Sequence, residues 1–292
     1  MMNNKVGLVM EGGAMRGMFT AGVIDVFMEN GIEFPAAAGV SAGAVFGCNL
    51  KSRQIGRVIR YNKRYCRDKR YCSVQSLIKT GDLYGADFCY RELPETLDVF
   101  DKDAYEQNPM TFTVVCTDVL TGKPVYQRLD KVDENCFLWM RASASMPMVS
   151  KPVRVGGYTL LDGGMSDAIP LRYMQEQGYE KNIVILTRPR SYVKKPSSPM
   201  LMQLGLRRYP AMVKVMQKRH EMYAYQRAYV FASEKQGNTL VLCPDSDLPL
   251  SRTERDPEKL QQAYDEGRRI ALRELDNIKA FLTDDNGGQN GN

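Results

Sequence analysis

The chain of 292 residues contains a single histidine, His220, one tryptophan and no long apolar run. A helix that spans a bilayer needs about 20 consecutive apolar residues, and no such stretch is present. The first five residues lead directly into a strand pattern, without the apolar segment of a secretory signal. We therefore expect a globular protein of the cytoplasm.

Cysteine is present, but it lacks the spacing of a structural framework. The cysteines are odd in number, scattered and free of C-x-x-C pairs, which argues against both a disulfide framework and a zinc site. Most of them are expected to be buried thiols that pack as small apolar side chains. They are Cys48, Cys66, Cys72, Cys89, Cys116, Cys136 and Cys243.

Acidic residues are scarce in two segments of the chain. The net charge is only +6, but residues 51–70 carry nine basic side chains against one acid, Asp68. A second basic zone covers residues 188–227. Solvated helix faces, an anionic membrane surface and nucleic acid are the three interpretations of such charge. No nucleic-acid motif accompanies it, so nucleic acid is not expected as a partner.

The dominant pattern along the chain is an alternation of strand-like and helix-like segments. Runs rich in β-branched residues and bounded by polar residues or proline are typical of buried strands. Their alternation with helices predicts an α/β fold with a mainly parallel central sheet and helices on both faces. The expected strands cover residues 5–10, 34–38, 111–119 and 182–187, and the expected helices cover 17–30, 42–50, 133–146 and 171–177.

The composition changes after Arg188, where a segment rich in proline and lysine precedes a long basic helical stretch. We expect a main domain over residues 5–190, a smaller C-terminal extension over 191–283 and a disordered tail over 284–292. The elements expected in the extension are a helix over 200–232, a strand over 238–243, and a helix capped by Asp256 that runs from Pro257 to about residue 282.

A glycine-rich loop, Glu11-Gly12-Gly13-Ala14-Met15-Arg16-Gly17, joins the first expected strand to the first expected helix. Unpaired amides at the start of a helix favour an anion, so the loop suits an oxyanion hole or a dinucleotide pyrophosphate, beside a plain structural turn. The dinucleotide interpretation finds an acid, Glu33, 21 residues after Gly12. It has Ala14 where the second glycine should be. This interpretation would make the protein a nucleotide-binding oxidoreductase.

A second motif, Gly39-Val40-Ser41-Ala42-Gly43, lies between an expected strand and an expected helix. This G-x-S-x-G pattern suits a nucleophile, because flanking glycines permit the sharp turn that exposes the serine hydroxyl. An ordinary turn of small residues is the alternative. A serine hydroxyl needs a base within reach. With one histidine in the chain, the motif indicates a serine hydrolase whose base is another residue type.

The third motif, Leu160-Leu161-Asp162-Gly163-Gly164, is an apolar strand that ends in an aspartate. Asp162 is either a turn residue or a carboxylate at the edge of a parallel sheet where such folds bind ligands. Ser41, Asp162 and His220 also follow the chain order of an α/β-hydrolase triad. The residues around His220 form the interior of a polar helical pattern, however, which disfavours a triad.

Together, the three motifs resemble those of the patatin-like phospholipase family, especially its bacterial members. The resemblance covers about residues 5–190 and includes the stretch Arg141-Ala142-Ser143-Ala144-Ser145-Met146-Pro147. The C-terminal part resembles an extension found in one bacterial subgroup. The order and spacing of the three motifs are far more specific than any one of them.

For the site, the resemblance implies a Ser-Asp dyad in which Ser41 is the nucleophile and Asp162 its partner. Ala14 departs from the glycine usual in the family, and a positive φ angle at this alanine would be strained. The other residues that the resemblance implies are Gly12, Gly13 and Ala14 as the oxyanion hole, Arg16 as the basic residue of the glycine motif, and Gly39, Gly43, Gly163 and Gly164 as supporting residues.

The implied reaction is acyl transfer from an ester to Ser41 and then to water, with no metal or organic cofactor. A lipid or phospholipid ester is the expected substrate, because a buried apolar cleft would both raise the pKa of Asp162 and hold an acyl chain. The basic segments would then contact an anionic membrane surface, at the inner membrane. A non-catalytic protein of the same fold that binds acyl lipids or a partner is a further alternative.

Overall fold

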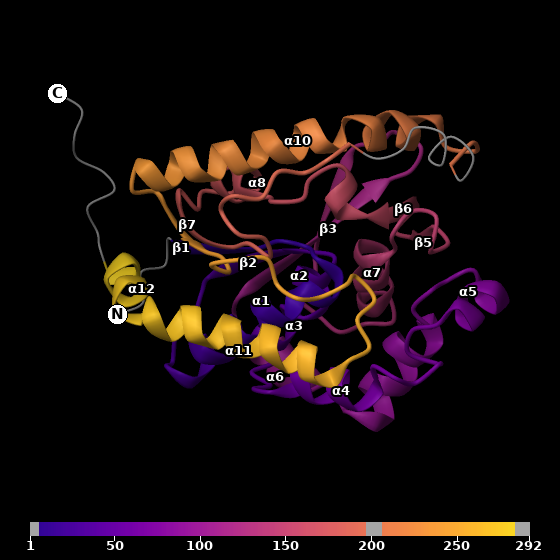
Figure 1. Cartoon of the computed structure of the whole chain (residues 1–292), viewed down its shortest axis with the longest axis horizontal. Helices are drawn as coiled ribbons and strands as arrows, with labels where there is room; N and C mark the ends of the chain where they lie inside the picture. The colour runs from indigo at the N-terminus through magenta and orange to yellow at the C-terminus, as the bar shows by residue number, and fades with distance from the viewer. Residues whose placement is uncertain (1–5, 197–205, 284–292) are drawn as a thin grey trace.

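The computed structural model describes residues 6–196 and 206–283, in which one eight-stranded sheet lies between layers of helices (Figure 1). The strand order is β5-β6-β3-β2-β1-β7-β8, and β4 pairs with β3. This arrangement confirms the predicted α/β architecture. The strands are β1 Val6–Met10, β2 Ala36–Val40, β3 Thr111–Asp118, β4 Pro124–Arg128, β5 Val153–Val155, β6 Tyr158–Asp162, β7 Lys181–Ile185 and β8 Thr239–Leu242.

The centre of the sheet is parallel and buried. Strand β1 pairs in parallel with β2 and with β7, and β2 pairs in parallel with β3. Every residue of β1, β2 and β7 is buried, as is typical of parallel strands that helices cover on both faces. The carboxyl ends of β1 and β2 therefore lie side by side, and they lead into the glycine loop and into Ser41.

The other edge of the sheet is antiparallel. Strand β6 pairs antiparallel with the last residues of β3, so that Asp162 lies opposite Cys116. In the neighbouring parallel pair, Val40 lies opposite Val115. Asp162 thus lies at the edge of the sheet where β2 ends. The strand that carries it, β6, runs in the opposite direction to β2 and β3, and it forms a hairpin with β5.

The C-terminal segment completes both faces of the sheet. Helix α10 (Pro210–Lys235) lies along one side of the sheet and α11 (Pro257–Arg273) along the other (Figure 1). Strand β8 extends the sheet in parallel with β7. Helix α11 packs closely on α1 (Gly17–Glu29), because a Cβ atom at Gly22 would lie 2.1 Å from the carbonyl oxygen of Tyr264.

Several expected helices have different bounds in the structure. The single helix expected over 42–50 is two short helices, and the helix expected up to residue 282 is interrupted at Glu274. The long basic helix begins only at Pro210, which has no amide to donate and so suits a first turn. Residues 200–205 of that expectation, and the tail 284–292, lie outside the described residues. The observed helices are α2 Ala42–Val45, α3 Cys48–Lys51, α7 Cys136–Ala144, α8 Leu171–Glu176 and α12 Leu275–Thr283.

The basic segment 51–70 is largely paired within the protein. The Lys51 ammonium group is buried and donates to the carbonyl oxygens of Asn108 and Met110, each at 2.6 Å. Most of the other basic side chains bind acids, amides or carbonyls of the same fold, as in Arg57, Arg60, Lys63 and Arg70. Most of this charge therefore stabilises the fold. The segment belongs to a set of helices that follow one another: α4 Arg57–Tyr65, α5 Val74–Thr80, a π-helix over Phe88–Leu97 and α6 Lys102–Gln107.

The surface and the cysteines follow ordinary burial rules. All seven cysteines have free thiols and six are buried, which confirms that most of them pack as apolar side chains.

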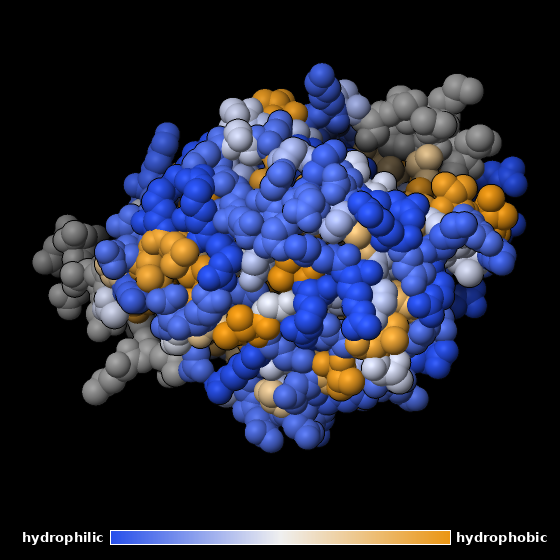
Figure 2. Space-filling model, turned by 60° about the horizontal axis from the view of Figure 1, so that its bottom comes forward, coloured by the Kyte–Doolittle hydropathy of each residue, from blue (hydrophilic) through white to orange (hydrophobic). Residues whose placement is uncertain are grey.

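One face of the molecule is mainly hydrophilic, with hydrophobic side chains in several small separate groups (Figure 2). Within residues 6–196 and 206–283, no helix has the length and apolar character that crossing a bilayer requires.

Candidate active site

Ser41 occupies a strained turn between β2 and α2. Its φ angle is +53° and its ψ angle is −118°, a combination that costs a non-glycine residue about 1–3 kcal/mol. The amide of Ser41 donates to the Ser143 hydroxyl at 2.8 Å, and that hydroxyl donates to the carbonyl oxygen of Val115 at 2.6 Å. The turn is therefore held by the neighbouring strand β3 and by helix α7.

The glycines on either side of Ser41 are required by close backbone contacts. A Cβ atom at Gly39 would lie 2.4 Å from the carbonyl oxygen of Gly43. A Cβ atom at Gly43 would lie 2.3 Å from the carbonyl oxygen of Met10. Both distances are far below van der Waals contact, so larger residues at either position would push α2 away from the sheet.

Asp162 lies next to Ser41 and is buried. One of its carboxylate oxygens accepts a hydrogen bond from the amide of Gly164 at 2.8 Å. Burial raises the pKa of Asp162, while the positive charge of Arg219 and hydrogen bonds from the Ser41 hydroxyl and the Gly164 amide oppose that rise. The structure thus brings together two residues that are separated by more than a hundred positions in the chain.

The glycines after Asp162 also fit their positions closely. A Cβ atom at Gly163 would lie 2.1 Å from the carbonyl oxygen of Val115, and one at Gly164 would lie 3.1 Å from the carboxylate of Asp162. Thr117 donates its hydroxyl proton to the carbonyl oxygen of Asp162 at 2.8 Å. This turn is held against the end of β3, on the same side as the Ser41 turn.

The glycine loop passes beside Ser41. A Cβ atom at Gly12 would lie 2.9 Å from the Cβ atom of Ser41. Within residues 6–196 and 206–283, the amides of Gly12 and Gly13 have no hydrogen-bond acceptor. Ala14 has a φ angle of +50°, the left-handed conformation for which glycine is the less strained residue. The loop therefore offers unpaired amides near the Ser41 hydroxyl, at a conformational cost at Ala14.

Glu11, the residue before the glycines, is a buried anchor that the motifs did not single out. Its carboxylate accepts hydrogen bonds from the Thr187 amide at 2.6 Å and from the Thr187 hydroxyl at 3.1 Å. It also accepts a short hydrogen bond from the hydroxyl of Tyr223 on α10. In the sequence, the signal for a buried carboxylate here is an acid between an apolar strand and a pair of glycines. The residues that donate hydrogen bonds to it come from distant segments, so the sequence alone does not identify them.

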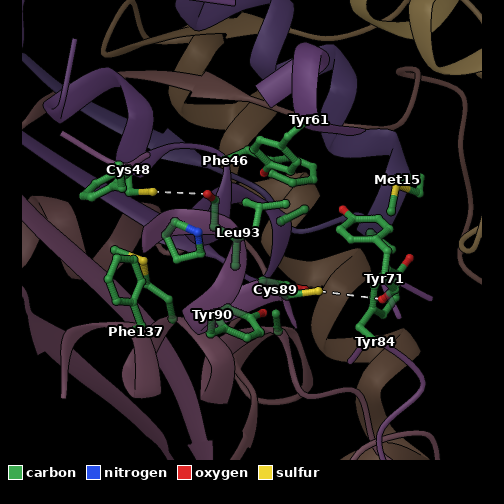
Figure 3. A pocket seen from close by; sticks show the side chains of 18 of the residues that line it. Met15, Phe46, Cys48, Tyr61, Tyr71, Tyr84, Cys89, Tyr90, Leu93 and Phe137 are labelled. Atoms are coloured by element: carbon green, nitrogen blue, oxygen red, sulfur yellow. Dashed lines mark hydrogen bonds between the residues drawn. The ribbon is translucent and has the colours of Figure 1, made fainter. Parts of the chain in front are cut away.

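An apolar pocket opens on one side of Ser41 (Figure 3). It encloses about 860 Å³ of empty space, part of which is open to solvent. Aromatic and aliphatic side chains from the helices between residues 42 and 97, together with α7, converge on this space (Figure 3). Its lining includes Met15, Phe46, Tyr61, Tyr71, Tyr84, Tyr90, Leu93, Phe137 and Met140.

A wider, polar recess opens on the other side of Ser41. It encloses about 1760 Å³ of empty space, part of which is solvent, and it includes Asp162 and the glycine loop. The two cavities share Ala14, Ser41 and Met146. Arg16 lines the recess, where burial and then the nearby charge of Arg188 lower its pKa to about 10. Ser41 therefore lies at the junction between an apolar and a polar space.

Two residues considered in the alternative interpretations lie elsewhere. Glu33 binds Arg53 at 2.6 Å and lines a separate pocket that does not include the glycine loop. The His220 imidazole lies 3.8 Å from the Glu221 carboxylate and does not line either cavity at Ser41. Its neighbour Arg219 does line the polar recess.

Comparison with protein families matches two parts of the chain. The model of the patatin-like phospholipase family matches residues 8–174. The model of a domain of unknown function, DUF6363, matches residues 209–283. The match to the first model covers more than half of the chain and contains the glycine loop, Ser41 and Asp162.

Individual relatives come from bacteria and from eukaryotes. The uncharacterized protein YjjU of Escherichia coli is 31% identical over 202 residues, which cover 63% of this chain and 52% of the relative. The uncharacterized NTE family protein Mb1092c of Mycobacterium bovis is 29% identical over 57% of this chain and 44% of its own. The chain thus spans about half the length of these curated relatives. Lysophospholipase NTE1 of Debaryomyces hansenii is 28% identical over 63% of this chain and 12% of its own.

A solved structure also aligns with most of the chain. The crystal structure of VipD from Legionella pneumophila aligns over 94% of this chain and 67% of its own, with a TM-score of 0.48 and 12% identity.

Proposed function

The chain belongs to the patatin-like phospholipase family, and we propose that it hydrolyses carboxylic esters of lipids with Ser41 as nucleophile and Asp162 as base. The observation that carries this proposal is the position of Ser41. Its hydroxyl acts on the pKa of the buried Asp162 carboxylate, and Ser41 lies at the mouth of an apolar pocket. A nucleophile, a base and an apolar cavity are thus adjacent to one another.

The proposed reaction has two acyl-transfer steps. The Ser41 oxygen attacks the ester carbonyl carbon while Asp162 accepts the hydroxyl proton, and the tetrahedral oxyanion receives hydrogen bonds from the amides of Gly12, Gly13 and Ala14. The C–O bond to the alcohol then breaks, and the alcohol leaves with the proton from Asp162. A water molecule, deprotonated by Asp162, attacks the acyl-enzyme. Asp162 then returns this proton to the Ser41 oxygen as the ester bond to Ser41 breaks and the carboxylic acid is released. No metal or organic cofactor enters this scheme.

The environment of Asp162 supports its proposed role as a base. A carboxylate with its ordinary pKa is a weak base, and proton transfer becomes more favourable as that pKa rises toward the working pH. Burial raises the pKa of Asp162. The amide of Gly164 fixes one carboxylate oxygen and leaves the other side of the group for the Ser41 hydroxyl.

The apolar pocket supports a lipid acyl chain as the acid part of the substrate. Sites for small apolar ligands are concave and have mainly apolar and aromatic linings. The pocket beside Ser41 has such a lining. A chain that enters it would bring the ester carbonyl to Ser41 and displace water from the side of the nucleophile.

The positions of Glu33 and His220 favour this proposal over a nucleotide-dependent oxidoreductase and over a Ser-Asp-His triad. The oxidoreductase would need Glu33 near the glycine loop, and Glu33 instead binds Arg53 in another pocket. The triad would need the imidazole between Ser41 and Asp162. His220 lines neither cavity at Ser41.

We propose that the enzyme works in the cytoplasm at an anionic membrane surface. The basic side chains that remain exposed in the segment 51–70, such as Arg64, Arg67 and Lys69, can attract anionic headgroups by about 1 kcal/mol each when they lie near the surface. The recess that holds Asp162 draws most of its basic residues, Arg188, Lys194, Lys195 and Arg219, from the second zone, 188–227.

Covalent labelling tests the proposed function directly. A fluorophosphonate probe should label the wild-type protein at Ser41, and peptide mapping by mass spectrometry identifies the site. Ser41→Ala should abolish labelling and ester hydrolysis, and Asp162→Asn should lower kcat by about 10³-fold or more. His220→Ala is the matched control and should retain most of the activity. A fully active Ser41→Ala or Asp162→Asn variant would refute the dyad, and a protein that binds lipid without being labelled would be the non-catalytic alternative.

A further inference from the structure

The polar recess beside Ser41 has a large excess of positive charge. Two acids line it, Glu11 and Asp162. Both are already bonded within the fold, Glu11 to Thr187 and Tyr223, and Asp162 to the amide of Gly164. The basic residues of the lining are Arg16, Arg188, Lys194, Lys195, Arg219 and Arg252. We call this set the cationic recess.

The positive charges of the cationic recess act on one another. Burial lowers the pKa of Lys194 to about 7, and the charges of Arg219 and Arg252 contribute to that shift. Burial also lowers the pKa of Arg219, and Arg252 again contributes. Like charges in a partly buried site are unfavourable unless an anion neutralises them.

Four of these side chains have donors that the fold does not use; one of them, Lys195, is exposed and forms no hydrogen bond or salt bridge within the described residues. The Nε atom of Arg16 is buried and makes no hydrogen bond. Within residues 6–196 and 206–283, the side chains of Lys194 and Arg252 form no hydrogen bond or salt bridge. Arg188 and Arg219 differ, because Arg188 binds Asp247 at 2.8 Å and Arg219 binds the carbonyl oxygen of Gly164 at 2.7 Å. Arg16, Lys194, Lys195 and Arg252 are therefore the residues available to a ligand.

The position of the recess relates this charge to the substrate. The recess and the apolar pocket share Ser41, Ala14 and Met146. An ester whose acyl chain lies in the apolar pocket and whose carbonyl lies at Ser41 would place its alcohol part in the cationic recess. Guanidinium and ammonium donors that reach one space from separate segments suit an anion with several oxygens, such as phosphate.

We propose that the cationic recess binds the phosphate of a lipid headgroup, so that the enzyme prefers esters whose alcohol carries a phosphate over neutral glycerides. This proposal rests on the proposed function and adds a substrate class to it. It also assigns a role to the C-terminal part of the chain. Arg219 and Arg252 lie within the domain of unknown function over residues 209–283, and Lys194 lies just before it. That part would select the substrate through its headgroup, while residues 8–174 supply the nucleophile and base.

The first experiment compares two esters that differ only in phosphate. Lysophosphatidate and monoacylglycerol with the same short acyl chain are assayed as monomers, below their critical micelle concentrations, so that membrane binding does not contribute. We expect the wild-type protein to have a higher kcat/KM for lysophosphatidate. Lys194→Gln and Arg252→Gln should each lower that value about tenfold, the usual effect of losing one charge-assisted hydrogen bond. They should lower the value for monoacylglycerol much less, so that the ratio between the two substrates falls.

Lys218→Gln is the matched control for charge. Lys218 is exposed on α10, next to Arg219 in the sequence, and does not line the recess. This variant should keep the wild-type ratio between the two substrates. An equal loss in all three variants would mean that net charge alone is responsible and would overturn the proposal, as would a wild-type protein that hydrolyses both esters equally well.

The second experiment distinguishes binding of a lipid phosphate from binding of free phosphate. Because it measures binding and not hydrolysis, it tests the recess even if the protein does not hydrolyse these esters. The Ser41→Ala protein is titrated with lysophosphatidate, monoacylglycerol and inorganic phosphate by calorimetry. We expect lysophosphatidate to bind more tightly than either of the others, and Lys194→Gln in the same background to remove that difference. Binding of inorganic phosphate with equal or higher affinity would identify an ion site and refute the headgroup assignment. Loss of activity on every ester with intact selective binding would refute the proposed function alone.

Discussion

Replacing Gly267 by alanine should reverse the usual effect of that substitution in a helix. In the interior of a free helix, glycine to alanine stabilises by about 1 kcal/mol. Gly267 lies in α11 against α1, and a Cβ atom there would lie 2.0 Å from the carbonyl oxygen of Phe19. This oxygen belongs to the backbone of α1, so no side-chain rotation can relieve the contact, and the helices would have to separate by roughly 1 Å.

The expected magnitude follows from these two opposing effects. Overpacking in a tight interface typically costs about 1–3 kcal/mol, and the rigid backbone contact places this site at the upper end. After subtraction of the gain in helix propensity, Gly267→Ala should lower the free energy of unfolding by about 2 kcal/mol. Because α1 begins at Gly17, directly after the glycine loop, a shift of α1 would also move the amides beside Ser41.

Urea unfolding followed by circular dichroism measures this change as a lower midpoint at an unchanged slope. Gln262→Ala is the control, because Gln262 is exposed on the same helix and its replacement should change the free energy of unfolding by no more than about 0.5 kcal/mol. If Gly267→Ala is more stable than the wild type, the close packing of α11 on α1 is refuted.

Three further predictions concern the site and its surroundings. The kcat/KM for a neutral soluble ester should fall as the pH decreases through the pKa of Asp162, which burial raises above 3.8; a profile that stays flat below pH 4 would contradict a role as base. Glu11→Gln should lower the free energy of unfolding by about 1–3 kcal/mol, since an amide NH₂ would face the donors on Thr187 or Tyr223, and an unchanged thermal midpoint would exclude that anchor. Sedimentation with vesicles should increase with anionic lipid and decrease with salt, and equal binding to neutral vesicles would reject the membrane proposal.

The sequence predicts the centre of this fold well, because local patterns determine it. The strands around Leu8, Ala38, Val114 and Ile183 are short apolar runs with clear boundaries, and each appears as a buried strand. The G-x-S-x-G motif likewise predicts a turn with a close glycine contact. In these places the local structure follows from residues that are adjacent in the sequence, without knowledge of the rest of the chain.

The rest depends on contacts between distant segments. Asp162 reaches Ser41 through an antiparallel hairpin whose register with β3 has no separate mark in the sequence. Lys51 appears as one more basic residue in a charged run, yet it is buried on two carbonyl oxygens. The charges of Lys194 and Arg252 become one feature only when the loops that carry them meet in space.

The carboxylate of Glu11 has a consequence for how this protein can be divided. One of its oxygens is bound by Thr187, just after β7, and the other by Tyr223 on α10, so a fragment ending at residue 174 would lack both partners. In such a fragment, water would have to take the place of these donors, next to the glycine loop. A gene that encoded the first part alone would therefore lose the support of that loop, even with every motif residue intact.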